Sequence, residues 1–270
     1  MIEALIVLLS GLLLTLITLA VWRALRGPAR GRGAAVRRAA VVGLVTVPLV
    51  TLAAWNLSNS RDFQFFGGMV NRVETSEPVV ALTFDDGPQP EATDEILAIL
   101  GRAGVRATFF VTGNELAANL PAAQRLVAAG HELGNHSYSH ARMIGQPYEW
   151  VQSEVERTDA LIRAAGYTGP IHFRPPYSKR LLVLPYYLSV TGRTTIFTDV
   201  EPESYPEIAA GAETMTAHVL DRVRPGSIIL LHVMYPARAE TMRAVPAILA
   251  GLQAKGYRFV TVTELLALRR

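Results

Sequence analysis

The chain of 270 residues contains no cysteine. Its absence excludes a disulfide framework, and it also excludes a thiolate as a nucleophile or metal ligand. A protein without cysteine is compatible with a site outside the cytoplasm, but this composition does not establish one.

Acidic residues are scarce in residues 1–55, where two apolar runs, 4–22 and 39–55, are separated by an arginine-rich loop, 23–38, without acidic residues. The first run is long enough to cross a hydrocarbon core of about 30 Å at about 1.5 Å per residue. The second run is shorter and is interrupted by a glycine and a proline. We therefore predict that this segment is a membrane anchor of one or two transmembrane helices.

A short arginine-rich loop between two spans is retained on the cytoplasmic side of a membrane. Everything after Trp55 then lies outside, so we expect a protein of the cell (inner) membrane whose catalytic part faces the periplasm or exterior. A cleaved signal peptide is the alternative for the first run, although its start, Met1-Ile2-Glu3, lacks the usual positive charge. A single span followed by a buried or interfacial helix is the other alternative.

A basic surface is also missing beyond the anchor. The whole chain has a formal charge of +3, and residues 1–55 hold six arginines and one glutamate, which leaves −2 for the remainder. This balance gives no basis for nucleic-acid binding. The sequence shows no clear internal repeat, and no protein partner can be inferred from it.

Residues 56–77 read as a polar linker with a short aromatic cluster, Phe63, Phe65 and Phe66. These rings either lie against lipid or cover the floor of the domain that follows, and the sequence leaves both options open. We expect the remaining residues, 78–270, to form the catalytic domain.

From residue 78 onward, short apolar runs alternate with longer segments of helical period. This alternation predicts repeated β-α units around a parallel sheet. We expect an α/β fold, a distorted (β/α) barrel of about seven parallel strands. The predicted strands are 79–84, 107–111, 131–135, 171–174, 194–198, 227–232 and 258–262. The predicted helices are 90–103, 121–129, 148–165, 212–223 and 238–254.

Polar residues gather at or just beyond the ends of the predicted strands. In a barrel the carboxyl ends of the strands converge on one face, where active sites usually lie, whereas an open sheet would spread the same residues along a line. The residues in question are Asp85, Asp86, His136, His140, Arg174, Tyr177, Asp199, Glu201 and His232.

Two pairs of these residues have the composition of a metal site. Asp85 and Asp86 are adjacent like charges, which a low-dielectric site tolerates only with a cation or proton to share. His136 and His140 are four residues apart, so both rings can lie on one face of a turn or helix. One carboxylate and two imidazoles make three metal ligands, and the other carboxylate can act as a base on a metal-bound water. Taken singly, each pair is also explained as an ordinary turn or loop, and His232 as a core histidine.

Four segments together resemble the ordered motifs of the polysaccharide deacetylase family, the NodB-homology domain of carbohydrate esterase family 4. The resemblance covers roughly residues 78–268 and implies a distorted (β/α) barrel that hydrolyses an N-acetyl group on an amino sugar with the help of a metal. The segments are Thr83-Phe84-Asp85-Asp86-Gly87-Pro88, His136-Ser137-Tyr138-Ser139-His140, Arg174-Pro175-Pro176-Tyr177 and Ile228-Ile229-Leu230-Leu231-His232.

The resemblance implies a catalytic role for five residues. Asp86, His136 and His140 would bind a divalent metal, for which Zn²⁺ is expected. Asp85 would be the general base. His232 would be the general acid that protonates the departing amine.

The same resemblance implies three residues that contact the substrate. Arg174, Tyr177 and Leu230 would line the substrate site, and the backbone N–H of Tyr177 would help to stabilise the tetrahedral oxyanion. A preorganised donor of this kind is worth about 2.7–4 kcal/mol.

The sequence also departs from the family pattern. The fourth motif usually carries an Asp followed by Trp, and that Asp orients the catalytic histidine, but Ser204 and Tyr205 stand here. His232 would then lack its usual anionic partner, unless Glu201 or Glu203 supplies it. We expect hydrolysis to survive while substrate choice or pH optimum differs. Two smaller departures are Ser178 and Val233.

The sequence therefore predicts a membrane-anchored, metal-dependent deacetylase acting on an extracytoplasmic N-acetylated glycan, either peptidoglycan or an exported polysaccharide. One alternative keeps the chemistry but places the acyl group on a lipid-linked sugar. Another is a catalytically silent metal-binding or glycan-binding module, motivated by the altered fourth motif. An iron oxygenase with two histidines and one carboxylate shares the ligand set but is disfavoured because nothing indicates a cosubstrate. The sequence does not identify the glycan, the acetyl position or the oligomeric state.

Overall fold

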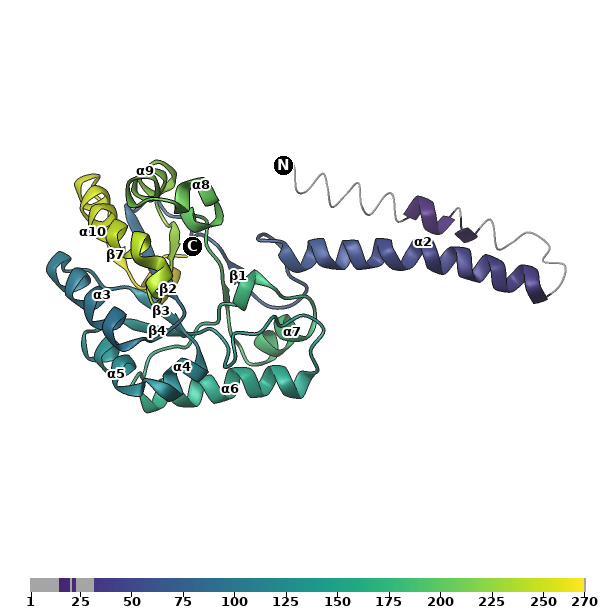
Figure 1. Ribbon diagram of the computed structural model, residues 1–270, viewed down its shortest axis with the longest axis horizontal. Helices are drawn as coiled ribbons and strands as arrows, with labels where there is room; N and C mark the ends of the chain where they lie inside the picture. The colour runs from purple at the N-terminus through teal and green to yellow at the C-terminus, as the bar shows by residue number, and fades with distance from the viewer. Residues whose placement is uncertain (1–14, 20, 23–31, 270) are drawn as a thin grey trace. The chain divides into compact units, whose positions relative to one another are not determined.

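The computed structural model describes residues 15–19, 21–22 and 32–269 (Figure 1). The chain divides into two compact units, residues 1–60 and 61–270. The candidate site lies entirely within the second unit.

The first unit contains the long helix α2 (Arg32–Asn59). Within the described residues it is the one helix long and apolar enough to cross a membrane, since its 28 residues at about 1.5 Å each span about 42 Å. The apolar run 39–55 lies inside it, but the helix begins seven residues earlier, so part of the predicted loop 23–38 is helical. Five of these seven residues are arginine or alanine, which are good helix formers. Most of the run 4–22 lies outside the described residues.

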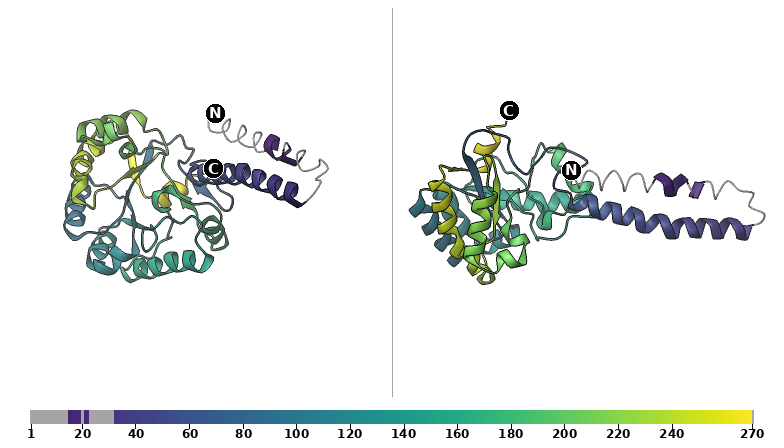
Figure 2. Two further views of the ribbon diagram at one scale, coloured as in Figure 1. Left: turned by 45° about the vertical axis from the view of Figure 1, so that its right-hand side comes forward. Right: turned by 90° about the horizontal axis from the view of Figure 1, so that it is seen from above.

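The second unit is an α/β fold in which the strands pair in parallel and helices surround them (Figure 2). Its strands are β1 (Met69–Val70), β2 (Val79–Asp85), β3 (Thr108–Val111), β4 (Glu132–Asn135), β5 (Thr195–Ile196), β6 (Ile228–Leu231) and β7 (Arg258–Val260). β2 is central, with β6 on one side and both β3 and β7 on the other, and β4 follows β3. β1 and β5 form a separate parallel pair.

Five helices of this unit match the predicted helices to within one residue at each end. They are α3 (Pro90–Ala103), α5 (Leu120–Ala128), α6 (Tyr148–Ala164), α9 (Ala212–Arg222) and α10 (Ala239–Ala254). Four more were not predicted, because three are too short to show a helical period and the fourth, α7, is apolar almost throughout. These are α4 (Gly113–Ala118), α7 (Val183–Val190), α8 (Pro206–Ala209) and α11 (Val262–Leu266). Short 3₁₀ turns are η1 (Pro176–Ser178), η2 (Pro202–Ser204) and η3 (Pro236–Arg238).

The alternation of side chains along β2 explains how the site is positioned. Every residue of β2 is buried, as expected for a parallel strand covered on both faces. Val80, Leu82 and Phe84 join the large core shared with α3, α9 and α10, whereas Val79 and Ala81 join a second core with α11. Because side chains alternate with a period of two, Asp85 points to the same face as Val79 and Ala81. We call this the inner face.

The predicted strand 171–174 is wrong, since only Phe173 makes strand-like pairings there. It bridges in parallel to Asn135 at the end of β4 and to Thr195 at the start of β5. Prolines stand just before and just after the segment, and a proline cannot donate to a ladder. A further parallel bridge joins Val200 to Ile229 of β6. Parallel pairing therefore runs from β4 through Phe173 to β5, and the same chain segment pairs again with β6 at Val200.

Candidate active site

The two adjacent aspartates lie where β2 ends. Asp85 is the last residue of the strand, and Asp86 (φ 74°) and Gly87 (φ 76°) turn the chain in the left-handed region. Position 87 needs glycine for a second reason, because a Cβ there would lie 2.6 Å from Cγ of Met234. The N–H of Gly87 donates to Oε2 of Glu115 at 2.7 Å, which fixes the turn.

The two histidines lie on a turn that follows β4, not on a helix. Ser137 and His140 both have positive φ, a conformation that costs a non-glycine residue about 1–3 kcal/mol and persists only where neighbours enforce it. Asn135 Oδ1 accepts from the N–H of Ser137 at 2.8 Å, and Ser137 Oγ accepts from the N–H of His140 at 3.1 Å. The buried Glu154 of α6 accepts from two further N–H groups, those of Tyr138 and Ser139. The turn is therefore held by hydrogen bonds to Asn135 and Ser137 on its own segment and to Glu154 on α6.

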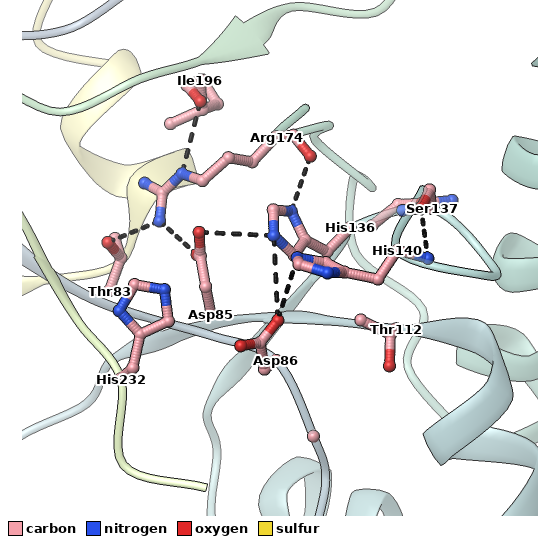
Figure 3. Close-up of polar contacts among 12 residues, drawn as sticks. Thr83, Asp85, Asp86, Thr112, His136, Ser137, His140, Arg174, Ile196 and His232 are labelled. Carbon is pink, nitrogen blue, oxygen red and sulfur yellow. Dashed lines mark hydrogen bonds and ion pairs between the residues drawn. The ribbon is translucent and has the colours of Figure 1, made fainter. Parts of the chain in front are cut away.

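Asp86, His136 and His140 meet at one point, and one potential ligand atom from each lies within 4.8 Å of the others (Figure 3). Asp86 Oδ1 is 3.3 Å from His140 Nε2 and 4.0 Å from His136 Nε2. His136 Nδ1 donates to the carbonyl oxygen of Arg174 at 2.7 Å, which leaves Nε2 as the nitrogen with a free lone pair.

These donors fit a divalent metal. Asp86 Oδ1 is buried and has no hydrogen-bond partner among the described residues, as expected for an oxygen that serves as a metal ligand. Burial and the neighbouring His136 lower the pKa of His140 more than Asp86 and Asp85 raise it. His140 is therefore held in the neutral form that binds metals. Three ligands of this type leave a fourth position open, as in catalytic zinc sites.

Asp85 is paired with Arg174 next to the three ligands. Arg174 donates from one guanidinium nitrogen to Asp85 Oδ1 at 2.6 Å and to Thr83 Oγ1 at 2.9 Å. Asp85 Oδ2 lies 3.6 Å from His136 Nε2 and so faces the three ligands. Burial raises the pKa of Asp85, but the charges of Arg174, His136 and His232 outweigh it and hold that pKa below its usual value. Asp85 is therefore a carboxylate at neutral pH.

His232 follows β6 and is held by Glu203 from η2. His232 Nδ1 donates to Glu203 Oε2 at 2.7 Å, and the backbone N–H of His232 donates to the same oxygen at 2.9 Å. The other carboxylate oxygen accepts from Thr241 Oγ1 at 2.7 Å and contacts Arg238 at 3.5 Å. Burial lowers the pKa of His232, but the hydrogen bond to Glu203 and the charge of Asp85 outweigh it and raise that pKa.

The three residues expected to contact substrate lie in different environments. Tyr177 is exposed, has φ 56°, and places its ring 4.7 Å from that of His140. Leu230 is buried in β6, and by strand alternation it shares its face with His232. Arg174 is also buried, and its hydrogen bonds go to Asp85, Thr83 and a backbone carbonyl instead of towards solvent.

The sequence had left two candidates for the partner of His232, and the structure places Glu203 there. Glu201 instead forms an ion pair with Arg61 at 2.5 Å. Ser204 is exposed, and Tyr205 packs its ring against His218 at 5.3 Å. Neither residue at the expected Asp-Trp position therefore supports His232.

Supporting residues such as Glu115, Asn135 and Glu154 were missed by the sequence reasoning. Each binds backbone N–H groups of the site loops through its side chain. Glu115 also accepts from Tyr235 Oη at 2.9 Å, so one carboxylate joins the turn after β2 to the loop after β6. Their signal in the sequence is weak, because Glu115 and Asn135 are polar residues close to predicted strand ends and Glu154 is a polar residue inside a predicted helix, both of which are common.

The chain is similar to known proteins in both sequence and structure. The polysaccharide deacetylase family matches residues 72–195. The chain is 30% identical over 206 residues to a peptidoglycan-N-acetylglucosamine deacetylase of Bacillus cereus, which covers 76% of this chain and 96% of that protein. It is 32% identical to a chitooligosaccharide deacetylase of Bradyrhizobium, over 69% of this chain and 90% of that protein. The structure of a peptidoglycan N-acetylglucosamine deacetylase superposes with a TM-score of 0.69 at 28% identity, over 73% of this chain and 92% of that one.

Proposed function

Because the chain belongs to the polysaccharide deacetylase family, we propose that it is a metal-dependent hydrolase that removes N-acetyl groups from the amino sugars of a glycan. The observation that carries this proposal is the arrangement of Asp86, His136 and His140 beside two further charged pairs, Asp85 with Arg174 and His232 with Glu203. We assign residues 78–270 to the catalytic domain. The parallel pairings that continue from β4 towards β6 support the distorted (β/α) barrel expected for it.

Asp86, His136 and His140 are the residues that would hold the metal, with Zn²⁺ as the expected ion. When bound, the metal would polarise the acetamide carbonyl and lower the pKa of a nearby water. Asp85 accepts the proton of the attacking water through Oδ2, the oxygen that faces the ligands. Arg174 holds Oδ1 in place, so we assign it to positioning the base instead of binding the sugar.

His232 supplies the proton that the departing amine needs. Its Nδ1–H is engaged by Glu203, so Nε2 is the nitrogen that donates this proton. Glu203 stabilises the protonated ring and fixes its orientation. The N–H of Tyr177 acts on the developing oxyanion, and the exposed ring of Tyr177 together with Leu230 borders the sugar.

The relatives act on peptidoglycan and chitooligosaccharides by their names, which supports an N-acetylglucosamine-type glycan as the substrate. We propose peptidoglycan or an exported polysaccharide, reached from the cell membrane by an enzyme anchored through α2 and facing the periplasm or exterior. The presence of a helix that can span a membrane also keeps a lipid-linked sugar as the second candidate substrate. The altered fourth motif suggested a catalytically silent binding module because His232 would lack an anionic partner. Glu203 provides such a partner, so this reason no longer applies.

The test is release of acetate by the full chain, purified in detergent and loaded with Zn²⁺. N-acetylglucosamine oligomers, purified peptidoglycan and undecaprenyl-linked sugars would be compared as substrates. The matched control is Asp85→Asn, which keeps all three proposed ligands. Acetate from the first two substrates supports the proposal, and acetate from the third alone supports the lipid-linked alternative. No release from any of the three with metal bound would overturn deacetylation.

A further inference from the structure

An aromatic surface outside the active site is left exposed on the second unit. It consists of Phe63, Phe65, Phe66, Tyr148 and Tyr186, whose side chains are between 37% and 47% exposed. We call these five residues the aromatic patch. Scattered exposed apolar residues are normal, but a contiguous group of large ones marks a surface that meets something other than water.

The five rings come from three parts of the chain, and ring contacts link them into two groups that the segment 63–66 joins. Phe63 and Phe65 have ring centroids 5.1 Å apart, and Phe66 stands 5.6 Å from Tyr186 of α7. Tyr186 is in turn 6.3 Å from Tyr148, the first residue of α6. Two further exposed apolar residues, Leu182 and Val190, stand at the two ends of α7.

The backbone beneath the rings is held in place. Gln64 donates from its amide to the carbonyl oxygens of Phe66 at 2.7 Å and Gly68 at 3.2 Å. Arg180 donates to the carbonyl oxygen of Phe63 at 2.9 Å. Gly67 lies so close to α7 that a Cβ there would be 3.2 Å from Cβ of Ser189. The rings therefore point outward from an ordered segment instead of covering the domain floor, one of the two options that the sequence had left.

The position of the patch along the chain indicates what covers it. α2 ends at Asn59, and the second unit begins at Arg61, which forms an ion pair with Glu201, so Ser60 is the one residue of the sequence between the helix and that unit. Phe63 follows four residues after Asn59, a stretch that reaches at most about 14 Å when fully extended. The headgroup layer on each side of a bilayer is roughly 5–8 Å thick, and aromatic residues concentrate there.

We propose that the aromatic patch lies in the headgroup layer of the membrane that α2 crosses. This inference rests on the proposed membrane anchor. The patch then acts as a second attachment beside the helix, and it limits how the catalytic unit can turn over the lipid surface. Lipid is favoured over a partner protein because the chain itself brings Phe63 to within a few residues of the bilayer.

Site-directed labelling tests this cleanly because the chain has no cysteine of its own. The full chain would carry one fluorescent label at a time, in nanodiscs of phosphatidylethanolamine and phosphatidylglycerol. The doxyl quencher would sit near the headgroups for the labels at 65, 186 and 205, and near the bilayer centre for the label at 47, which is the middle of the apolar run 39–55. Phe65→Cys and Tyr186→Cys report on the patch, and Val47→Cys reports on α2. Tyr205→Cys is the matched control, since Tyr205 is an equally exposed tyrosine outside the patch.

We expect the labels at positions 65 and 186 to be quenched at least about twofold more than the label at 205. If Val47→Cys is quenched while both patch labels match the control, the patch proposal is overturned and the anchor stands. If Val47→Cys is not quenched, the anchor proposal is overturned, and strong quenching at 65 and 186 would still support lipid contact by the patch. Two patch positions are used so that a local disturbance at one does not decide the result.

Discussion

Asp85 and His232 are each held by a buried or nearly buried partner of opposite charge, but the two partnerships act in opposite directions. Arg174 lowers the pKa of Asp85, whereas Glu203 raises the pKa of His232. A general base must be deprotonated and a general acid protonated at the same pH. Separating the two pKa values in this way keeps both residues in their working forms over a common pH range.

Arg174 and Glu203 also differ in which other parts of the site they contact. Arg174 connects Asp85 to Thr83 and lies directly behind the proposed metal ligands, since its carbonyl oxygen accepts from His136. Glu203 connects His232 to α10 through Thr241, away from those ligands. Changes at Glu203 should therefore affect the acid alone, and changes at Arg174 should affect the base and its surroundings.

The largest effect should come from the aspartates themselves. Asp85→Asn should lower kcat/KM by about 10²–10⁴-fold while zinc remains bound, because only the proton acceptor is lost. Asp86→Asn should lose zinc, because Asp86 Oδ1 lies within 4.0 Å of Nε2 of both His136 and His140. Acetate release and zinc content per chain would be measured on the same samples. Equal loss of zinc in both variants would show that the two aspartates do not divide these roles.

Glu203→Gln should have the next largest effect, a fall in kcat/KM of about 10- to 100-fold. The acid works only while His232 is protonated, so activity is lost as pH rises through its pKa. Removing the Glu203 charge lowers that pKa, and the alkaline limb of the pH profile should therefore move to lower pH. The measurement is kcat/KM against pH with the metal content held constant.

Glu203→Asp is the matched control, since it keeps the charge on a shorter side chain. Its alkaline limb should lie between those of the parent and Glu203→Gln. An unchanged limb in Glu203→Gln, with lower activity at every pH, would mean that Glu203 has a purely structural role.

Arg174→Lys should cost less, about three- to tenfold in kcat/KM, because it keeps a positive charge near Asp85 but loses the planar fork. The base works only while deprotonated, so activity is lost as pH falls through the pKa of Asp85. A weaker cation raises that pKa, and the acid limb should move to higher pH. Arg174→Met should move it further and destabilise the fold by about 3–5 kcal/mol, since Asp85 is left buried without its partner. An acid limb that stays in place in both variants would rule out control of the base by Arg174.

Much of the fold could be predicted because it depends on local pattern. The apolar run of β2 and the 3.6-residue period of α3 are both properties of neighbouring residues, and both segments were placed to within one residue. The segment 171–174 failed because its strand-like composition is opposed by flanking prolines, and α7 failed because it is apolar on nearly every side. The start of α2 was missed because charge, which marks a loop in membrane topology, does not prevent a helix.

The site shows the same limit at the level of single side chains. Asp86, His136 and His140 could be proposed from residue type and motif, because metals select few donor groups. Motif alignment pointed to Ser204 as the position facing His232, and the choice between Glu201 and Glu203 stayed open. That choice depends on the course of η2 and on Arg61, which lies 140 residues from Glu201 in the sequence and binds it. Long-range pairings of this kind leave no local pattern.

The smallest effect is expected from Ser204→Asp, which restores the family residue at its aligned position. Ser204 is exposed, and Glu203 already accepts from both the ring and the backbone of His232. The added carboxylate should therefore leave kcat/KM within about twofold and the alkaline limb in place, because an exposed charge is screened by water. The decisive measurement is the double variant Ser204→Asp/Glu203→Gln, which should be as impaired as Glu203→Gln alone. Recovery of activity in the double variant would mean that the η2 turn can present either position to His232, and Glu203 would then be one of two interchangeable partners.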